Sequence, residues 1–110
     1  MKIENNMTNQ LATRNFLKAT MKIIAENTSP NYSIVVINGI KEQLSKEFAF
    51  LKNIHIKGKE IKVDETLNSI NGKELKNFLT KIVDSIGTNY IKVLLARNLT
   101  QKEFAYLENL

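Results

Sequence analysis

The residues that could carry out catalysis or bind a metal are few and scattered in this chain of 110 residues. There is no cysteine, one histidine (His55) and only two aspartates, Asp64 and Asp84. Enzymes need nucleophiles or titrating bases gathered in one place, and a zinc or transition-metal site needs several suitable ligands. We therefore expect a protein without enzymatic activity, without a catalytic residue, and without a cofactor or metal.

Asp64 and Glu65 form the only adjacent acidic pair. Neighbours in sequence do not share a face of a helix or strand, and no histidine or arginine lies close enough in sequence to suggest a partner. Acidic side chains favour the first turn of a helix, so we interpret this pair as a turn and a helix start. His55, between Ile54 and Ile56, is expected to be solvated.

A cluster of basic residues lies on a predicted hairpin near residues 53–63. Apolar residues alternate with polar ones on both sides of a Lys57-Gly58-Lys59 turn, which is typical of two strands with one buried face: Ile54, Ile56, Ile61 and Val63. The candidate nucleic-acid contacts are Lys52, His55, Lys57, Lys59 and Lys62. Lysines on edge strands also prevent unwanted strand pairing, so both explanations stay open.

The net charge of +5 allows the same two interpretations. A positive charge favours nucleic acid or an acidic surface as partner. However, only Arg14 and Arg97 among the 16 basic residues are arginines, the type preferred for bidentate phosphate and guanine contacts. An excess of Lys, Asn and Ile also follows from the codons of a genome rich in A and T.

Several helices are predicted from apolar periodicity and caps. The first covers residues 8–26. The most clearly defined one has Asn71 as N-cap, apolar residues up to Ile86 and Gly87 at its end. Thr88 can cap a further helix as far as about Arg97. Thr100 and Glu103 form a capping box for the last helix, whose end lacks a capping signal and is expected to fray or to be completed by a partner.

Residues 32–37 are ambiguous. Their β-branched and aromatic side chains, followed by Asn38-Gly39, are compatible with a strand and hairpin turn. An apolar stripe continues through this pair as far as Leu51, and Ser29-Pro30 is typical of a helix start. We favour a helix over residues 31–51.

Residues 91–107 contain the run Leu99-Thr100-Gln101-Lys102-Glu103-Phe104-Ala105. This segment resembles the first helix and the start of the second in Cro and repressor-type helix-turn-helix domains, a resemblance that implies sequence-specific DNA binding. It covers 17 of the 110 residues, and the chain ends at Leu110 before the turn and recognition helix. The resemblance therefore implies no DNA-contacting residue here.

Taken together, the patterns predict one small domain over residues 1–110 with a disordered tail at 1–7. The expected fold is mostly α with a small β part, an α+β arrangement of about four to five helices around one core and one basic hairpin. No signal peptide or membrane span is evident, so we expect a cytoplasmic protein without membrane contact.

The expected function is that of a regulatory module that docks on a protein partner or associates with itself. Its candidate interface is the apolar face of the last helix: Phe104, Leu107 and Leu110. The alternative is nucleic-acid binding through the lysine-rich hairpin, or through the C-terminal segment that resembles an incomplete helix-turn-helix.

Overall fold

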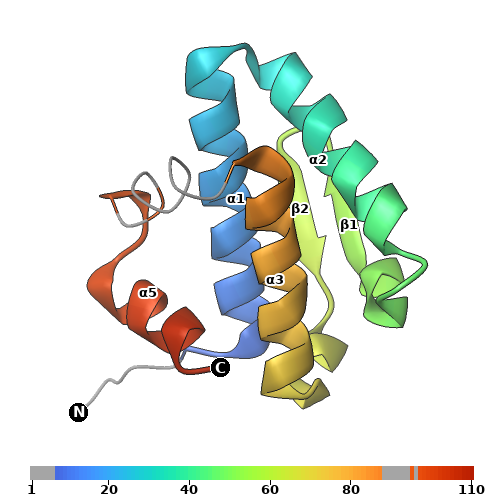
Figure 1. The fold of residues 1–110 in the computed structure, drawn as a ribbon, viewed down its shortest axis with the longest axis vertical. Coiled ribbons are helices and arrows are strands. Elements are labelled where there is room, and N and C mark those ends of the chain that lie inside the picture. The colour runs from blue at the N-terminus through green and yellow to red at the C-terminus, as the bar shows by residue number, and fades with distance from the viewer. Residues whose placement is uncertain (1–6, 88–94, 96) are drawn as a thin grey trace.

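The computed structural model describes residues 7–87, 95 and 97–110. In chain order the elements are α1 (Asn9–Asn27), α2 (Pro30–Leu44), the 3₁₀ helix η1 (Ala49–Asn53), β1 (Ile54–Lys57), β2 (Glu60–Val63), the 3₁₀ helix η2 (Glu65–Ser69), α3 (Gly72–Ile86) and α5 (Gln101–Glu108) (Figure 1). The predicted fold, mostly α with one hairpin, is confirmed. The predicted tail at 1–7 and the predicted helix at 88–97 lie outside the described residues, apart from residues 7, 95 and 97.

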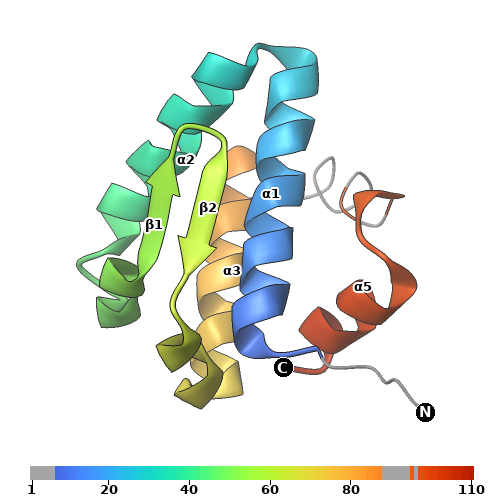
Figure 2. The ribbon, with the colours of Figure 1, turned by 180° about the vertical axis from the view of Figure 1, so that it is seen from behind.

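Helix α1 is the central element of the domain. It contacts α2, α3, α5, η2 and strand β2, and it lies between the hairpin and α5 (Figures 1 and 2). Its predicted apolar stripe is buried, with Phe16 4% and Leu17 2% exposed. Among the described residues, no helix is both long and apolar enough to cross a membrane.

The predicted helix starts are confirmed. Ser29 caps α2, with Pro30 as its first residue, and Asn71 caps α3 by accepting a hydrogen bond from the backbone N–H of Lys73. Thr100 and Glu103 form the complete capping box of α5. These side chains satisfy backbone N–H groups that a helix leaves without an internal partner.

The helix predicted over residues 31–51 is correct for residues 32–37 but wrong at its end. Helix α2 ends at Leu44, whose carbonyl accepts hydrogen bonds from the N–H groups of Glu47 and Phe48, both at 3.0 Å. Phe48 and Phe50 are both buried, and two residues so spaced lie about 200° apart on an α-helix. Burying both requires the chain to leave the helix, and η1 follows.

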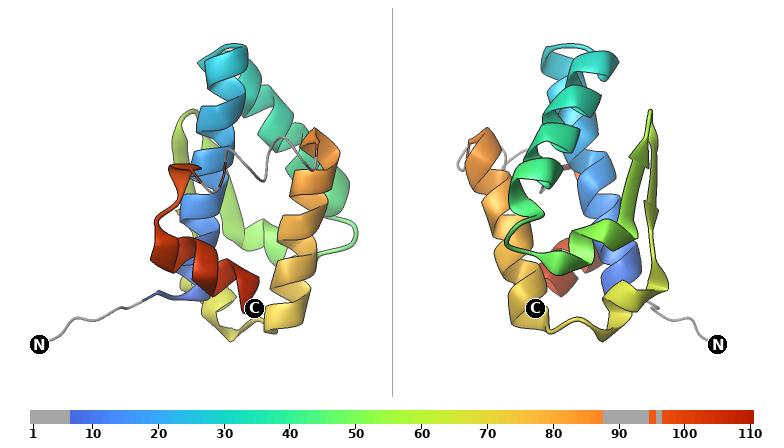
Figure 3. Two further views of the ribbon diagram at one scale, coloured as in Figure 1. Left: turned by 60° about the vertical axis from the view of Figure 1, so that its left-hand side comes forward. Right: turned by 90° about the vertical axis from the view of Figure 1, so that its right-hand side faces the viewer.

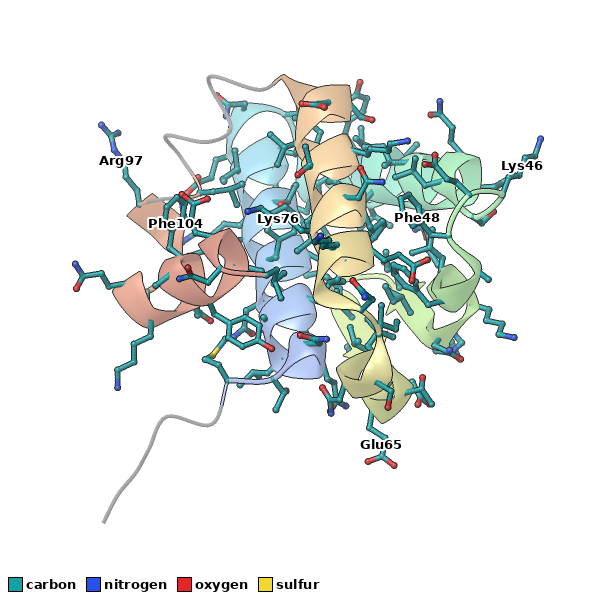
Figure 4. All side chains as sticks on the ribbon, turned by 60° about the horizontal axis from the view of Figure 1, so that its bottom comes forward. Lys46, Phe48, Glu65, Lys76, Arg97 and Phe104 are labelled. Atoms are coloured by element: carbon teal, nitrogen blue, oxygen red, sulfur yellow. The ribbon has the colours of Figure 1, made fainter. Side chains whose placement is uncertain are left out.

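Three phenylalanines join this segment to α3. The ring centroids of Phe48 and Phe50 lie 5.6 and 5.4 Å, respectively, from that of Phe78, in edge-to-face arrangements. Phe48 lies on the side of α3 that faces away from α5 (Figure 4). Lys81 of α3 covers the outside of the cluster, 5.8 Å from the centroid of the Phe48 ring, and pairs with Glu47.

Polar contacts attach α5 to the start of α1. Asn9 is 9% exposed; its amide donates to the carbonyls of Leu67 and Ile70, and its Oδ1 accepts a hydrogen bond of 2.6 Å from the hydroxyl of Tyr106. Asn15 also donates to the carboxylate of Glu103. Since no residue of α5 is fully buried, these bonds do much to position it.

Thr13 provides a test of the core of α1. It is 0% exposed, and its hydroxyl is the one buried side-chain polar atom in the described part of the chain that lacks a hydrogen-bond partner. Thr13→Val is expected to raise the free energy of unfolding by about 1 kcal/mol, because it removes an unsatisfied polar group at little change in volume.

Urea unfolding measures this change. Thr20→Val is the control, since Thr20 is equally buried but its hydroxyl donates to the carbonyl of Phe16 at 2.8 Å. An equal gain in the free energy of unfolding for both variants would contradict the attribution of the effect to the unsatisfied hydroxyl of Thr13.

Candidate nucleic-acid interface

A basic groove lies where α1, the first turn of α2 and the tip of the hairpin meet. It has a volume of about 260 Å³ and is lined by Lys18, Met21, Lys22, Ala25, Pro30, Ser33 and Lys59. In Figure 2 the tip of the hairpin reaches the region between α1 and α2. The groove thus brings together lysines that are 37 to 41 positions apart in the sequence.

Helix geometry places two of these lysines. Lys18 and Lys22 are separated by one turn of α1 and are exposed, on the same stripe as Arg14. The opposite face of α1 is buried in the core, so these long side chains point outward. The result is a row of three cations along about 12 Å of helix.

The packing of the hairpin against α1 places the third lysine. Ile61 and Val63 of β2 are buried, and Nε2 of Gln10 donates to the carbonyl of Val63 at 2.8 Å. Gly58, with φ of 57°, forms the two-residue turn with Lys59, at the position where a type II′ turn takes glycine. The turn therefore presents Lys59 at the end of the hairpin that adjoins α2.

The charges of the basic groove are unbalanced. None of its lining residues is acidic, and within the described part of the chain Lys18, Lys22 and Lys59 have no ion-pair or hydrogen-bond partner. Three like charges in one concavity repel one another. A bound anion would relieve this repulsion.

The basic residues predicted from the hairpin do not all gather there. Lys59 lines the basic groove, whereas Lys57, His55 and Lys62 are exposed on the outer face of the strands. Across the pair, Lys57 lies opposite Glu60, and His55 lies opposite Lys62. Glu60 therefore opposes part of the charge on this face.

Lys52 lies elsewhere. It is exposed on η1 and lines a separate groove that also includes Lys41 and the carboxylate-bearing Glu42. Of the predicted basic residues, only Lys59 therefore lines the basic groove. The other two lysines of the groove, Lys18 and Lys22, were not predicted as contacts from the sequence, although they repeat with Arg14 at helical spacing.

The acidic pair has the structural role predicted for it. Asp64 caps η2, its Oδ1 accepting a 2.9 Å hydrogen bond from the N–H of Thr66. Thr66, through its backbone and hydroxyl, lowers the pKa of Asp64 below the usual 3.8; desolvation acts in the opposite direction, and His55 adds a smaller lowering effect. Distance along the sequence suggested no histidine partner for Asp64, and it is the antiparallel pairing of the two strands that brings His55 near enough for this small effect.

The lowered pKa predicts a specific acid sensitivity. A carboxylate with a lower pKa in the folded state stabilises the fold above its unfolded pKa, and this contribution is lost as the pH falls through the folded value. Wild-type protein is therefore expected to lose more stability below about pH 4 than Asp64→Asn, which keeps the capping oxygen without the charge. Urea unfolding at pH 7 and pH 3 compares them; equal losses would contradict the prediction.

The predicted protein interface lies on the other side of α1. Phe104, Leu107 and Leu110 are partly buried and pack against the core. Phe104 and Leu107 also line a mainly apolar groove of about 230 Å³ with side chains that include Phe16, Leu79 and Val83. The face of α5 that was expected to meet a partner therefore packs largely within the molecule.

The end of α5 also differs from the prediction. Nζ of Lys76 donates to the carbonyl of Glu108 at 2.9 Å, and the N–H of Asn109 donates to the carbonyl of Ala105. Leu110 lies against Gly72, where an added Cβ would come within 3.3 Å of the Leu110 carbonyl carbon. Figure 3 shows the C-terminus beside the start of α3. The helix end is thus completed by this chain's own α3.

The described residues contain no cluster of three or more His, Cys, Asp or Glu side chains placed to hold a metal ion. The chain was also compared with known proteins. No model of a protein family matches it, and neither a curated protein nor a solved structure is significantly similar to it.

Proposed function

We propose that this protein binds nucleic acid through the basic groove, without catalysing a reaction. The observation that carries the proposal is the convergence of Lys18, Lys22 and Lys59 on one groove that has no acidic lining residue. Lysine ammonium groups neutralise phosphates and release the counterions condensed on nucleic acid, which provides most of the affinity of non-specific binding. Arg14 extends the same surface along α1.

The groove supports this function better than the outer face of the hairpin does. On that face Glu60 lies opposite Lys57, so an approaching phosphate meets a carboxylate as well as lysines. In the basic groove the three lysines surround a concave surface that several phosphate oxygens can approach together. We therefore propose that the hairpin takes part mainly through Lys59.

We prefer nucleic-acid binding, which the sequence offered as the alternative, to the docking function that the sequence favoured. Docking through Phe104, Leu107 and Leu110 would compete with their packing against the core of the same molecule. The lysines of the basic groove have no such internal role in the described part of the chain. Binding nucleic acid would also account for part of the net charge of +5 and suit a cytoplasmic protein.

The test is a titration of the full chain with a labelled DNA duplex of about 20 base pairs at 50 and 200 mM salt. Three phosphate contacts give a log–log slope of about −2.7, so the affinity is expected to fall about 40-fold between these two concentrations. Anionic lipid vesicles form a second arm. Binding to vesicles but not to duplex, or a duplex affinity that does not change with salt, would refute the proposal.

A further inference from the structure

We infer that the basic groove binds the phosphate backbone without reading the base sequence; this inference rests on the nucleic-acid function proposed above. The three cations that line the groove are lysines. An ammonium group is a compact point charge, whereas bidentate recognition of guanine is made most often by the planar fork of arginine. Lys18, Lys22 and Lys59 are therefore suited to phosphates.

Some of the amide and hydroxyl side chains of the groove and of α1 already donate a hydrogen bond within the chain. The hydroxyl of Ser33, which lines the groove, donates to the carbonyl of Pro30 at 2.7 Å. On α1, the amide of Gln10 donates to the carbonyl of Val63, and that of Asn27 donates to the carbonyl of Ile23 at 3.0 Å. Each bond uses one N–H of the amide and fixes its orientation, whereas reading adenine requires an Asn or Gln amide whose second N–H and oxygen both face the base.

Arg14 is the one arginine on the same stripe of α1 as the groove lysines. It lies one turn before Lys18, outside the residues that line the groove. Arg97, the other arginine, is exposed and points away from the body of the molecule beyond α5 (Figure 4). Arg14 is therefore the side chain of this face best suited to a bidentate contact with guanine, and Arg14→Lys tests this role while keeping the charge.

The experiment measures the dissociation constants of the full chain for three duplexes of equal length and unrelated sequence, at the same salt concentration. We expect values within about three-fold of one another, because one good bidentate base contact alone discriminates by roughly 5- to 150-fold. Arg14→Lys is expected to change the affinity for all three duplexes by the same factor.

Each possible outcome has a defined meaning. One duplex bound more than tenfold tighter than the others would overturn this inference while leaving nucleic-acid binding in place, and loss of that preference in Arg14→Lys would identify the base contact. Absence of binding to all three duplexes would overturn both this inference and the proposed function.

Discussion

Phe78→Ala is expected to lower the free energy of unfolding by about 3–5 kcal/mol, a large part of the stability of a domain of this size. Phe78 is 2% exposed and contacts both Phe48 and Phe50 in edge-to-face pairs. It also borders a very small internal void together with residues of α1, α2 and the hairpin. Truncation would enlarge this void and remove contacts between α3 and η1.

Phe104→Ala is the matched control for this change. It removes the same atoms from a side chain that is only partly buried, so we expect less than half of the loss. Urea unfolding followed by circular dichroism gives the free energy of unfolding of both variants. If Phe78→Ala does not fold, its loss of free energy exceeds the whole stability of the domain, which agrees with the large loss expected. Equal losses in two folded variants would show that the three-ring cluster is not the main anchor of α3.

Reversing the charge of the groove lysines together is expected to weaken duplex binding at least about 100-fold at 50 mM salt. The triple variant Lys18→Glu, Lys22→Glu, Lys59→Glu loses three phosphate contacts, and three carboxylates then face the phosphates of the duplex. All three positions are exposed, Lys18 and Lys22 lie on α1, where Glu has nearly the same helix propensity as Lys, and Lys59 lies in the turn of the hairpin, so the fold should be retained.

A matched triple variant separates the groove from the overall charge. Lys46, Lys73 and Lys102 are also exposed and do not line the basic groove. Reversing them also changes the formal net charge from +5 to −1, since each substitution removes two positive units. We expect this control to lose at most a few-fold in affinity. Equal losses in both triple variants would mean that net charge alone drives the binding.

Local patterns were enough to predict most elements of the fold. Caps at Ser29, Asn71 and Thr100 and the alternation around Gly58 each act within a few residues, and all four predictions are confirmed. The end of α2 was mispredicted because apolar periodicity treated Phe48 as a continuation of the helical stripe. Phe50 is buried as well, and its burial depends on a contact with Phe78 that is distant in sequence and cannot be inferred from local patterns.

The basic groove could not be predicted for the same physical reason. Lys18 and Lys22 are recognisable as an exposed pair on one helix, and Lys59 as a turn residue. Their convergence depends on the packing of β2 against α1 and on the angle at which α2 leaves α1, and both are tertiary properties. The cluster on the hairpin was easier to see because its members are neighbours in sequence.

The attachment of α5 has a consequence for the order in which parts of this domain open. Helix α5 has no fully buried residue, whereas α3 has five, so α5 should unfold locally at a lower free energy and its amide protons should exchange with solvent earlier. Because Tyr106 bonds to Asn9, 97 positions away, Asn9→Ala should accelerate exchange in α5 far more than in α3. Exchange rates in the last helix would then report on the integrity of the first turn of α1.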